Sequence, residues 1–192
     1  RTQGGVVSDE LVEFHRRVAA GGVGMTTVAY LAVAPGGRTD SGALWLHPEV
    51  VGALRRLTDA VHAEGALVAA QIGHAGPVAN AASNGAPAYA PSPMFNPLSM
   101  RRTRAATEDD IARITSEFAT ATRLCVQAGF DSIEVHLGHN YLLSSFLSPA
   151  FNHRSDEWGG PLEARARFAR QVMRTVRTAA GPAPKVVELR LV

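Results

Sequence analysis

Two histidines followed closely by a tyrosine are the residues of this sequence best suited to chemistry. His136 ends an apolar run and His139 comes just after it, so a turn could point both imidazoles in one direction. Two imidazoles can donate hydrogen bonds to one carbonyl or phenolate oxygen and stabilise the charge that develops there. Tyr141 adds a phenol, which can supply a proton to a conjugated system once hydride has arrived. The three residues predict a site that polarises and reduces an electrophile, the alternative being ordinary buried or exposed side chains.

A zinc site is a second interpretation of the same histidines. Their HxxH spacing lacks the helical i, i+4 geometry of HExxH sites. No third histidine, cysteine or carboxylate follows at the spacing typical of zinc ligands. We therefore expect no metal at this pair.

Gln71 and Arg190 are further candidates for ligand binding. The Gln71 carboxamide both donates and accepts, which suits the pyrimidine edge of a flavin, although a glutamine here can equally bond loop backbone. The small residues after His74 would let backbone approach a ligand closely. Arg190 lies in a mostly apolar run, where a guanidinium is costly to bury without an anion. It could stabilise the negative charge of a reduced flavin or pair with Glu188.

Four helix-then-strand units must position these residues. Ser8 is a good N-cap for the first helix, and Thr107 with Asp110 resembles a capping box for the third. The predicted helices cover 8–21, 48–64, 107–129 and 161–180, and the predicted strands cover 25–33, 66–72, 130–137 and 185–192. The strands are almost uninterruptedly apolar, which indicates a parallel sheet covered by helices.

The arrangement of loops favours a barrel over a doubly wound sheet. No GxGxxG or GxxxxGK[ST] turn follows a strand, so the nucleotide-binding doubly wound fold is disfavoured. Long loops at 73–106 and 138–160 follow strands, as at the face where barrels carry their chemistry. Four units make about half of an eight-stranded barrel, and the 192 residues suit one domain.

Composition narrows the class of protein. The net charge is only +2, and arginines stand beside acids in most segments, which argues against nucleic-acid binding. The single cysteine, Cys125, excludes a disulfide framework within this chain and favours a reducing cytoplasm. No apolar run approaches the roughly 20 residues that span a bilayer, and no signal segment opens the sequence, so we expect no membrane association. The sequence begins at Arg1 without a methionine, which is compatible with a processed or missing N-terminus.

Other conspicuous residues are interpreted as scaffold. Asn152, Arg154 and Asp156 predict a loop that hydrogen-bonds to itself before a packed turn. Arg165 and Arg167 are expected to pair with the carboxylates at 163 or 156. Cys125 is expected to be a buried small side chain on the apolar face of the third helix.

Together these motifs resemble the old yellow enzyme family, also called the NADH:flavin oxidoreductases, over essentially the whole chain. The strand-four pattern of that family, an HxxH pair followed by GYL and FLSPxxNxRxDxYGG, is matched by His136, His139, Tyr141, Leu142, Phe146, Leu147, Ser148, Pro149, Asn152, Arg154, Asp156, Gly159 and Gly160. Its QxxHAGR and ExRxRF motifs are matched by Gln71, His74, Ala75, Gly76, Glu163, Arg165, Arg167 and Phe168.

The resemblance implies a (β/α)8 TIM barrel with FMN at its C-terminal mouth. In such an enzyme the flavin, reduced by NADH or NADPH, delivers hydride to the β-carbon of an activated, enone-like alkene. Gln71 would bind the flavin pyrimidine, Arg190 its N1 and O2 side, and Tyr30 or its neighbours would line the ring through backbone. The substrate would be a small molecule, and a homo-oligomer is compatible with this picture.

For the substrate, the resemblance implies that His136 and His139 hold the carbonyl oxygen and that Tyr141 is the proton donor. Four positions depart from the pattern of the family. Pro77 replaces Arg, Asn140 replaces Gly, Trp158 replaces Tyr and Ala164 replaces Asn. Pro77 and Asn140 are expected to border the pocket and to change the choice of substrate.

The family's first strand and its C-terminal phosphate-binding strands find no counterpart in this sequence. Residues 1–192 are therefore expected to be a partial FMN-binding TIM-barrel domain that covers roughly strands 2 to 5. Two alternatives stay open beside an ene-reductase. One is a flavin-dependent amine or demethylating dehydrogenase of the same family. The other is a truncated, non-catalytic barrel that binds a partner.

Overall fold

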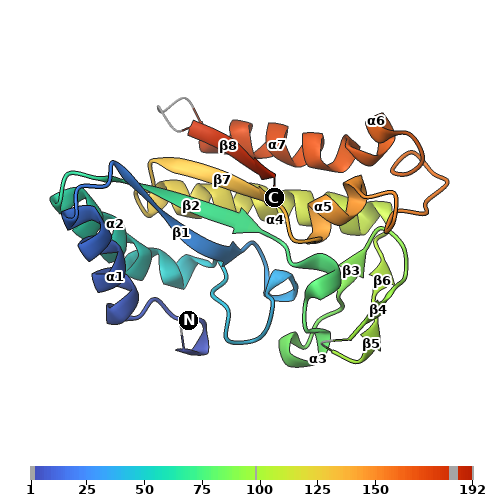
Figure 1. Ribbon diagram of the computed structural model, residues 1–192, viewed down its shortest axis with the longest axis horizontal. Helices are drawn as coiled ribbons and strands as arrows, with labels where there is room; N and C mark the ends of the chain where they lie inside the picture. The colour runs from blue at the N-terminus through green and yellow to red at the C-terminus, as the bar shows by residue number, and fades with distance from the viewer. Residues whose placement is uncertain (1–2, 98, 182–185, 192) are drawn as a thin grey trace.

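A four-stranded parallel sheet forms the centre of the computed structural model, which describes residues 3–97, 99–181 and 186–191. The strands are β1 (Met25–Ala32), β2 (Leu67–Gly73), β7 (Ser132–Leu137) and β8 (Val186–Leu191). They lie in the order β1-β2-β7-β8, and each pairs in parallel with its neighbour (Figure 1). The predicted parallel α/β arrangement is confirmed, with each strand within a residue or two of its expected range.

Each sheet strand is preceded by a helix whose ends follow local signals. These helices are α1 (Asp9–Ala20), α2 (Val51–Ala63), α4 (Glu108–Gln127) and α7 (Arg167–Ala180). The Ser8 hydroxyl accepts from the Leu11 amide at 3.3 Å, and Thr107 and Asp110 form the reciprocal capping box expected for α4. A 3-10 turn, Pro48–Val50, leads into α2. None of the described helices is long and apolar enough to cross a membrane.

A large hydrophobic core joins the inner faces of α2, α4 and α7 to the sheet. Leu57 of α2, Phe118 of α4 and Val172 of α7 are each fully buried and belong to one cluster with Val68 and Ile133 of the strands. Cys125 is also fully buried in this cluster, as predicted. The helices thereby fix the strands, whose carboxyl ends carry the candidate site.

The last predicted helix, 161–180, is in fact two. A turn at Ala166 separates α6 (Leu162–Arg165) from α7. The reason lies in Arg165, whose guanidinium donates to the carbonyls of Leu147, at 2.7 Å, and Gly160 and so ties the first turn to the preceding loop. The carboxylate partners predicted for the two arginines of this segment were wrong, since Arg167 pairs with Glu157 instead.

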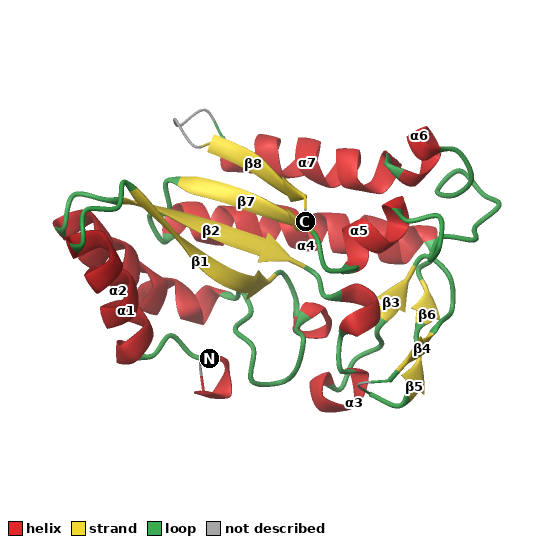
Figure 2. Ribbon diagram, viewed as in Figure 1, coloured by secondary structure: helices red, strands yellow, loops and turns green. Residues whose placement is uncertain are grey.

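The loops predicted at 73–106 and 138–160 contain short elements that sequence periodicity did not indicate. The first holds the 3-10 turn Gly76–Val78, α3 (Ala81–Asn84) and the two-residue strands β3 (Tyr89–Ala90), β4 (Phe95–Asn96), β5 (Arg101–Arg102) and β6 (Arg104–Ala105). The second holds α5 (Leu142–Leu147). Figures 1 and 2 show that β3 to β6 and α3 form a flap beside the carboxyl ends of the sheet strands.

Candidate active site

The turn after β7 brings the three predicted catalytic residues together. His136 lies in β7, and His139 and Asn140 both adopt left-handed backbone, with φ of 57° and 55°. Asparagine tolerates this conformation better than most residues, which explains how a position that is glycine in the family pattern can be Asn140 here. The turn brings the His139 ring over that of His136, with centroids 5.0 Å apart and planes at 23°. Tyr141 follows and precedes α5.

The two imidazoles hydrogen-bond to one another in this arrangement. His139 Nδ1 lies 2.9 Å from His136 Nε2, so one nitrogen donates and the other accepts. His136 is buried and His139 is exposed. The Tyr141 ring lies 5.0 Å from the His136 ring, edge to face, and 5.9 Å from the His139 ring. To hold a common substrate oxygen, the pair must exchange their mutual bond for bonds to that oxygen, and the exposed His139 is the ring with room to turn.

A second phenol, Tyr30 near the carboxyl end of β1, packs against this cluster. Its ring lies 5.4 Å from that of Tyr141, edge to face, and its hydroxyl donates to the Gly37 carbonyl at 2.7 Å. Burial raises the pKa of Tyr30 well above its usual value, and burial also raises the pKa of Tyr141. Both phenols are therefore protonated at neutral pH, as a proton donor must be. The sequence contained no signal for the contact between the two tyrosines.

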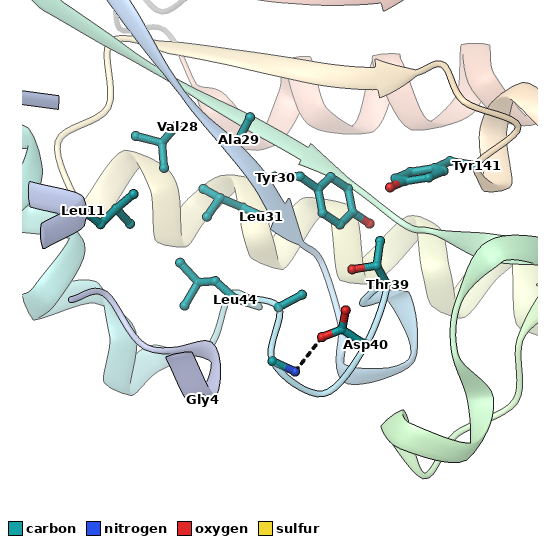
Figure 3. A pocket seen from close by; sticks show the side chains of 12 residues that line it. Gly4, Leu11, Val28, Ala29, Tyr30, Leu31, Thr39, Asp40, Leu44 and Tyr141 are labelled. Carbon is teal, nitrogen blue, oxygen red and sulfur yellow. Dashed lines mark hydrogen bonds between the residues drawn. The ribbon is translucent and has the colours of Figure 1, made fainter. Parts of the chain in front are cut away.

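The two tyrosines line a cavity of about 520 Å³ along β1. Figure 3 shows their rings at one end of this cavity, with Val28 and Leu31 of β1 along its wall. Asp40, in the loop opposite, accepts from the Gly42 amide at 2.9 Å and fixes that loop. The cavity walls are mainly apolar, which suits a planar aromatic group more than a charged one.

Gln71 of β2 is bonded to a carboxylate that sequence reasoning did not single out. Its Nε2 donates to Glu134 Oε1 at 2.5 Å, and the two residues are register partners across β2 and β7. Both are more than nine-tenths buried. A signal for Glu134 existed, because it stands two residues before His136 in a strand and so shares its face. The bond orients the Gln71 amide and leaves its carbonyl oxygen as an acceptor for a donor such as flavin N3–H.

The backbone of Arg190 lies opposite His136 in the register of β7 and β8, and that of Glu188 lies opposite Glu134. Arg190 and Glu188 were predicted to bind flavin or to pair here, but their side chains lie outside the part of the chain that the structure describes.

The segment after β2 supports residues 138–141, which carry two of the predicted catalytic side chains and are called the catalytic loop below. His74 is fully buried and its Nδ1 accepts from the Gly76 amide at 3.0 Å; burial lowers the pKa of His74 to about 3, so the ring is neutral. The His74 carbonyl accepts from the Leu142 amide at 2.9 Å. A Cβ on Gly76 would lie 2.5 Å from Leu142 Cα. The small residues here thus allow close approach of α5, the helix after Tyr141, where the sequence had suggested approach of a ligand.

The loop after α5 is the self-bonded scaffold that the sequence predicted. The Asn152 carboxamide donates to the carbonyls of Phe146 and Trp158, both at 2.8 Å. Arg154 and Asp156 form an ion pair at 2.5 Å. These contacts close the loop on itself and fix the end of α5.

The described residues thus form a parallel α/β sheet with an imidazole pair and a phenol at its carboxyl edge, an arrangement of the α/β class. The chain belongs to the NADH:flavin oxidoreductase / NADH oxidase family, which it matches over residues 1–192. It is 54% identical over 177 residues to a 4,4'-dithiodibutanoate disulfide reductase of Rhodococcus erythropolis, covering 92% of this chain and 44% of that protein. It is 37% identical over 163 residues to an NADPH dehydrogenase of Halalkalibacterium halodurans, covering 83% of this chain and 46% of that protein.

Solved structures show the same fold. Old yellow enzyme from Pichia sp. AKU4542 superposes with a TM-score of 0.90 at 25% identity, covering 98% of this chain and 53% of that one. Histamine dehydrogenase from Rhizobium sp. 4-9 superposes with a TM-score of 0.87 at 27% identity, covering 100% and 30%. The chain therefore spans half or less of the length of most of these relatives. The family resemblance predicted from the motifs is confirmed, and the family implies FMN as cofactor and NAD(P)H as electron donor, as expected.

Proposed function

We propose that residues 1–192 form the substrate-facing part of an FMN-binding barrel domain that transfers hydride from NAD(P)H to activated alkenes. The observation that carries this proposal is the cluster of His136, His139 and Tyr141 at the carboxyl end of β7. A hydrogen-bonding pair beside a protonated phenol is what the reduction of a conjugated carbonyl compound requires.

The donor set fits FMN. The Gln71 carboxamide, oriented by Glu134, offers an acceptor to the pyrimidine edge of the ring. We assign the backbone around Tyr30 to its planar face and Arg190 as the cation for its N1 and O2 side. When bound, FMN supplies the hydride that it takes from NAD(P)H.

The protein residues then act on the substrate. His136 and His139 donate to the carbonyl oxygen and lower the energy of the enolate that forms when hydride adds at the β-carbon. Tyr141 gives its phenolic proton to the α-carbon, and solvent returns a proton to the phenolate. The alkene gains one hydride and one proton, and NAD(P)H is oxidised to NAD(P)⁺.

A disulfide is the second candidate substrate, because the 54% identical relative is named as a reductase of 4,4'-dithiodibutanoate. Hydride and a proton convert such a disulfide into two thiols while NAD(P)H is oxidised. Cys125, the one cysteine of this chain, is fully buried and its pKa is raised by burial, so thiol exchange at this residue is not available. Among the groups of these 192 residues and the flavin, only the flavin could reduce the disulfide, by hydride transfer.

Anaerobic stopped-flow kinetics of the gene product that carries this chain tests the proposal. NADPH, cyclohex-2-enone, 4,4'-dithiodibutanoate and an N-methyl amine are each mixed with the flavoprotein. We expect cyclohexenone to reoxidise the reduced flavin, and Tyr141→Phe to slow that step by about 10²-fold, as for loss of a general acid, while flavin reduction by NADPH is spared. Equal loss in both half-reactions would refute the role of Tyr141. Flavin reduction by the amine would favour a dehydrogenase, and a colourless protein that ignores added FMN would favour a binding barrel.

A further inference from the structure

A second, smaller cavity lies beside His139. Its volume is about 200 Å³, and three segments line it: 77–78 after β2, 94–97 of the flap, and the catalytic loop with Phe151. Tyr141 lines the larger cavity and His139 lines this one, so the catalytic loop separates the two. A molecule whose oxygen is held at His139 can therefore extend into this smaller cavity.

The cavity is built on the two departures from the family pattern that were expected to border the pocket. Pro77 and Asn140 both line it. The family has arginine at the first position and glycine at the second, so its pattern would place a guanidinium where this chain has a buried, uncharged ring. Of the described residues that line the cavity, none is an acid, a lysine or an arginine, and His139 is the only one that can titrate.

A buried side chain of the flap holds one wall of the cavity in place. Asn96 of β4 is buried, and its Nδ2 donates to the carbonyls of Pro77, at 2.7 Å, and Ala79, at 2.9 Å. This side chain ties the flap to the turn after β2, so the cavity has a fixed wall. Met94, just before β4, and Phe95, its first residue, supply apolar surface to the cavity.

From these contacts we infer that the cavity binds an uncharged, apolar substituent of the substrate and that Pro77 and Met94 determine which substituent fits. The inference rests on the proposed function, because it takes the substrate oxygen to be held at His139. As a guide to size, an apolar cavity of about 150 Å³ holds benzene. A cavity of about 200 Å³ therefore accepts a group of the size of a phenyl or short alkyl chain, and a carboxylate would find no lysine or arginine among the described lining residues.

Steady-state kinetics with two enones tests the inference in the flavoprotein. Cyclohex-2-enone has no large substituent, whereas 4-phenylbut-3-en-2-one carries a phenyl group. We expect Met94→Trp, which fills the cavity, to raise the ratio of their KM values about tenfold, since a mismatch in an apolar pocket changes discrimination by about 10- to 200-fold. Met100→Trp is the matched control, because Met100 is 74% exposed and does not line the cavity. The inference would be overturned if both tryptophan variants changed the KM ratio equally, or if neither variant changed it.

Two further variants test the inference even if Met94→Trp does not fold. Pro77→Arg should shift preference from phenyl-substituted enones toward enones that carry a carboxylate. Phe95→Ala, at an exposed position, should lower the KM for a naphthyl-substituted enone relative to the phenyl one. Unchanged preferences in both would refute the assignment.

A binding measurement separates failure of this inference from failure of the proposed function. Titration calorimetry of 4-propylphenol against phenol needs no turnover. The wild type should bind 4-propylphenol about tenfold more tightly, and Met94→Trp should remove the difference. If enones are reduced but this difference is absent, the inference fails and the function stands. If the difference is present but no enone is reduced, the cavity assignment stands and the function fails.

Discussion

Gly76→Ala should destabilise the protein far more than an alanine at an otherwise similar glycine. Gly76 has φ of 56°, and a Cβ there would lie 2.5 Å from Leu142 Cα and 2.6 Å from its amide nitrogen. Gly85 is the matched control, because its φ is 65° and a Cβ there would meet nothing within 4 Å. Both substitutions force alanine into left-handed backbone, but only the first makes two backbones collide.

The contacts at the two glycines indicate how much the free energies of unfolding of the two variants should differ. Left-handed backbone costs alanine about 1–2 kcal/mol relative to glycine, which is the whole effect expected for Gly85→Ala. At Gly76, overpacking adds about 1–3 kcal/mol. Separation of α5 from β2 also weakens the 2.9 Å bond from the Leu142 amide to the His74 carbonyl, worth about 1 kcal/mol. Gly76→Ala should therefore lower the free energy of unfolding by about 3–6 kcal/mol.

Urea denaturation of both variants, followed by circular dichroism, measures this difference. Gly76→Ala should also disturb the spectrum of bound flavin or phenol, because α5 follows directly on Tyr141. Gly85→Ala should not. Equal destabilisation by the two alanines would refute the idea that close approach at Gly76 holds the catalytic loop.

Two further predictions concern the same region. His74 has a pKa of about 3 in the folded protein and the ordinary value of about 6.5 in the unfolded chain. The stability that the neutral His74 contributes is therefore complete above pH 6.5 and is lost as pH falls toward 3. The free energy of unfolding should fall by up to about 1.4 kcal/mol per pH unit in this window. His74→Asn should flatten this loss between pH 6.5 and 4.5 in urea titrations, and identical pH slopes would contradict it. Asn140 has φ of 55°. Asn140→Gly should therefore leave the free energy of unfolding nearly unchanged, whereas Asn140→Val should lower it by about 1–2 kcal/mol. Equal stability of the two variants would argue against the left-handed turn.

Signals confined to a few neighbouring residues predicted much of the fold. The Ser8 cap, the Thr107–Asp110 capping box and the apolar strands each act within one turn or one strand, so they could be identified before any tertiary contact was known. The flap could not be predicted in this way. Its strands are two residues long, and pairs such as Tyr89 with Arg104 join distant positions without a repeating pattern.

The candidate site was predicted in its residues but not in its geometry. His136, His139 and Tyr141 were identified from type and spacing, and the structure brings their rings together. Their mutual arrangement depends on consecutive left-handed residues, which sequence hinted at only through the asparagine. The Gln71–Glu134 bond joins residues 63 apart in the chain, so it required the strand register.

Binding of a phenolic ligand tests the assigned role of the histidine pair most directly. A phenolate held by His136 and His139 over oxidised flavin produces a long-wavelength charge-transfer band. In the His136→Ala, His139→Ala double variant we expect FMN to remain bound and this band to disappear on titration with a phenol. A double variant that keeps FMN and still develops the band with unchanged affinity would contradict the assignment of these histidines as the oxygen-binding pair.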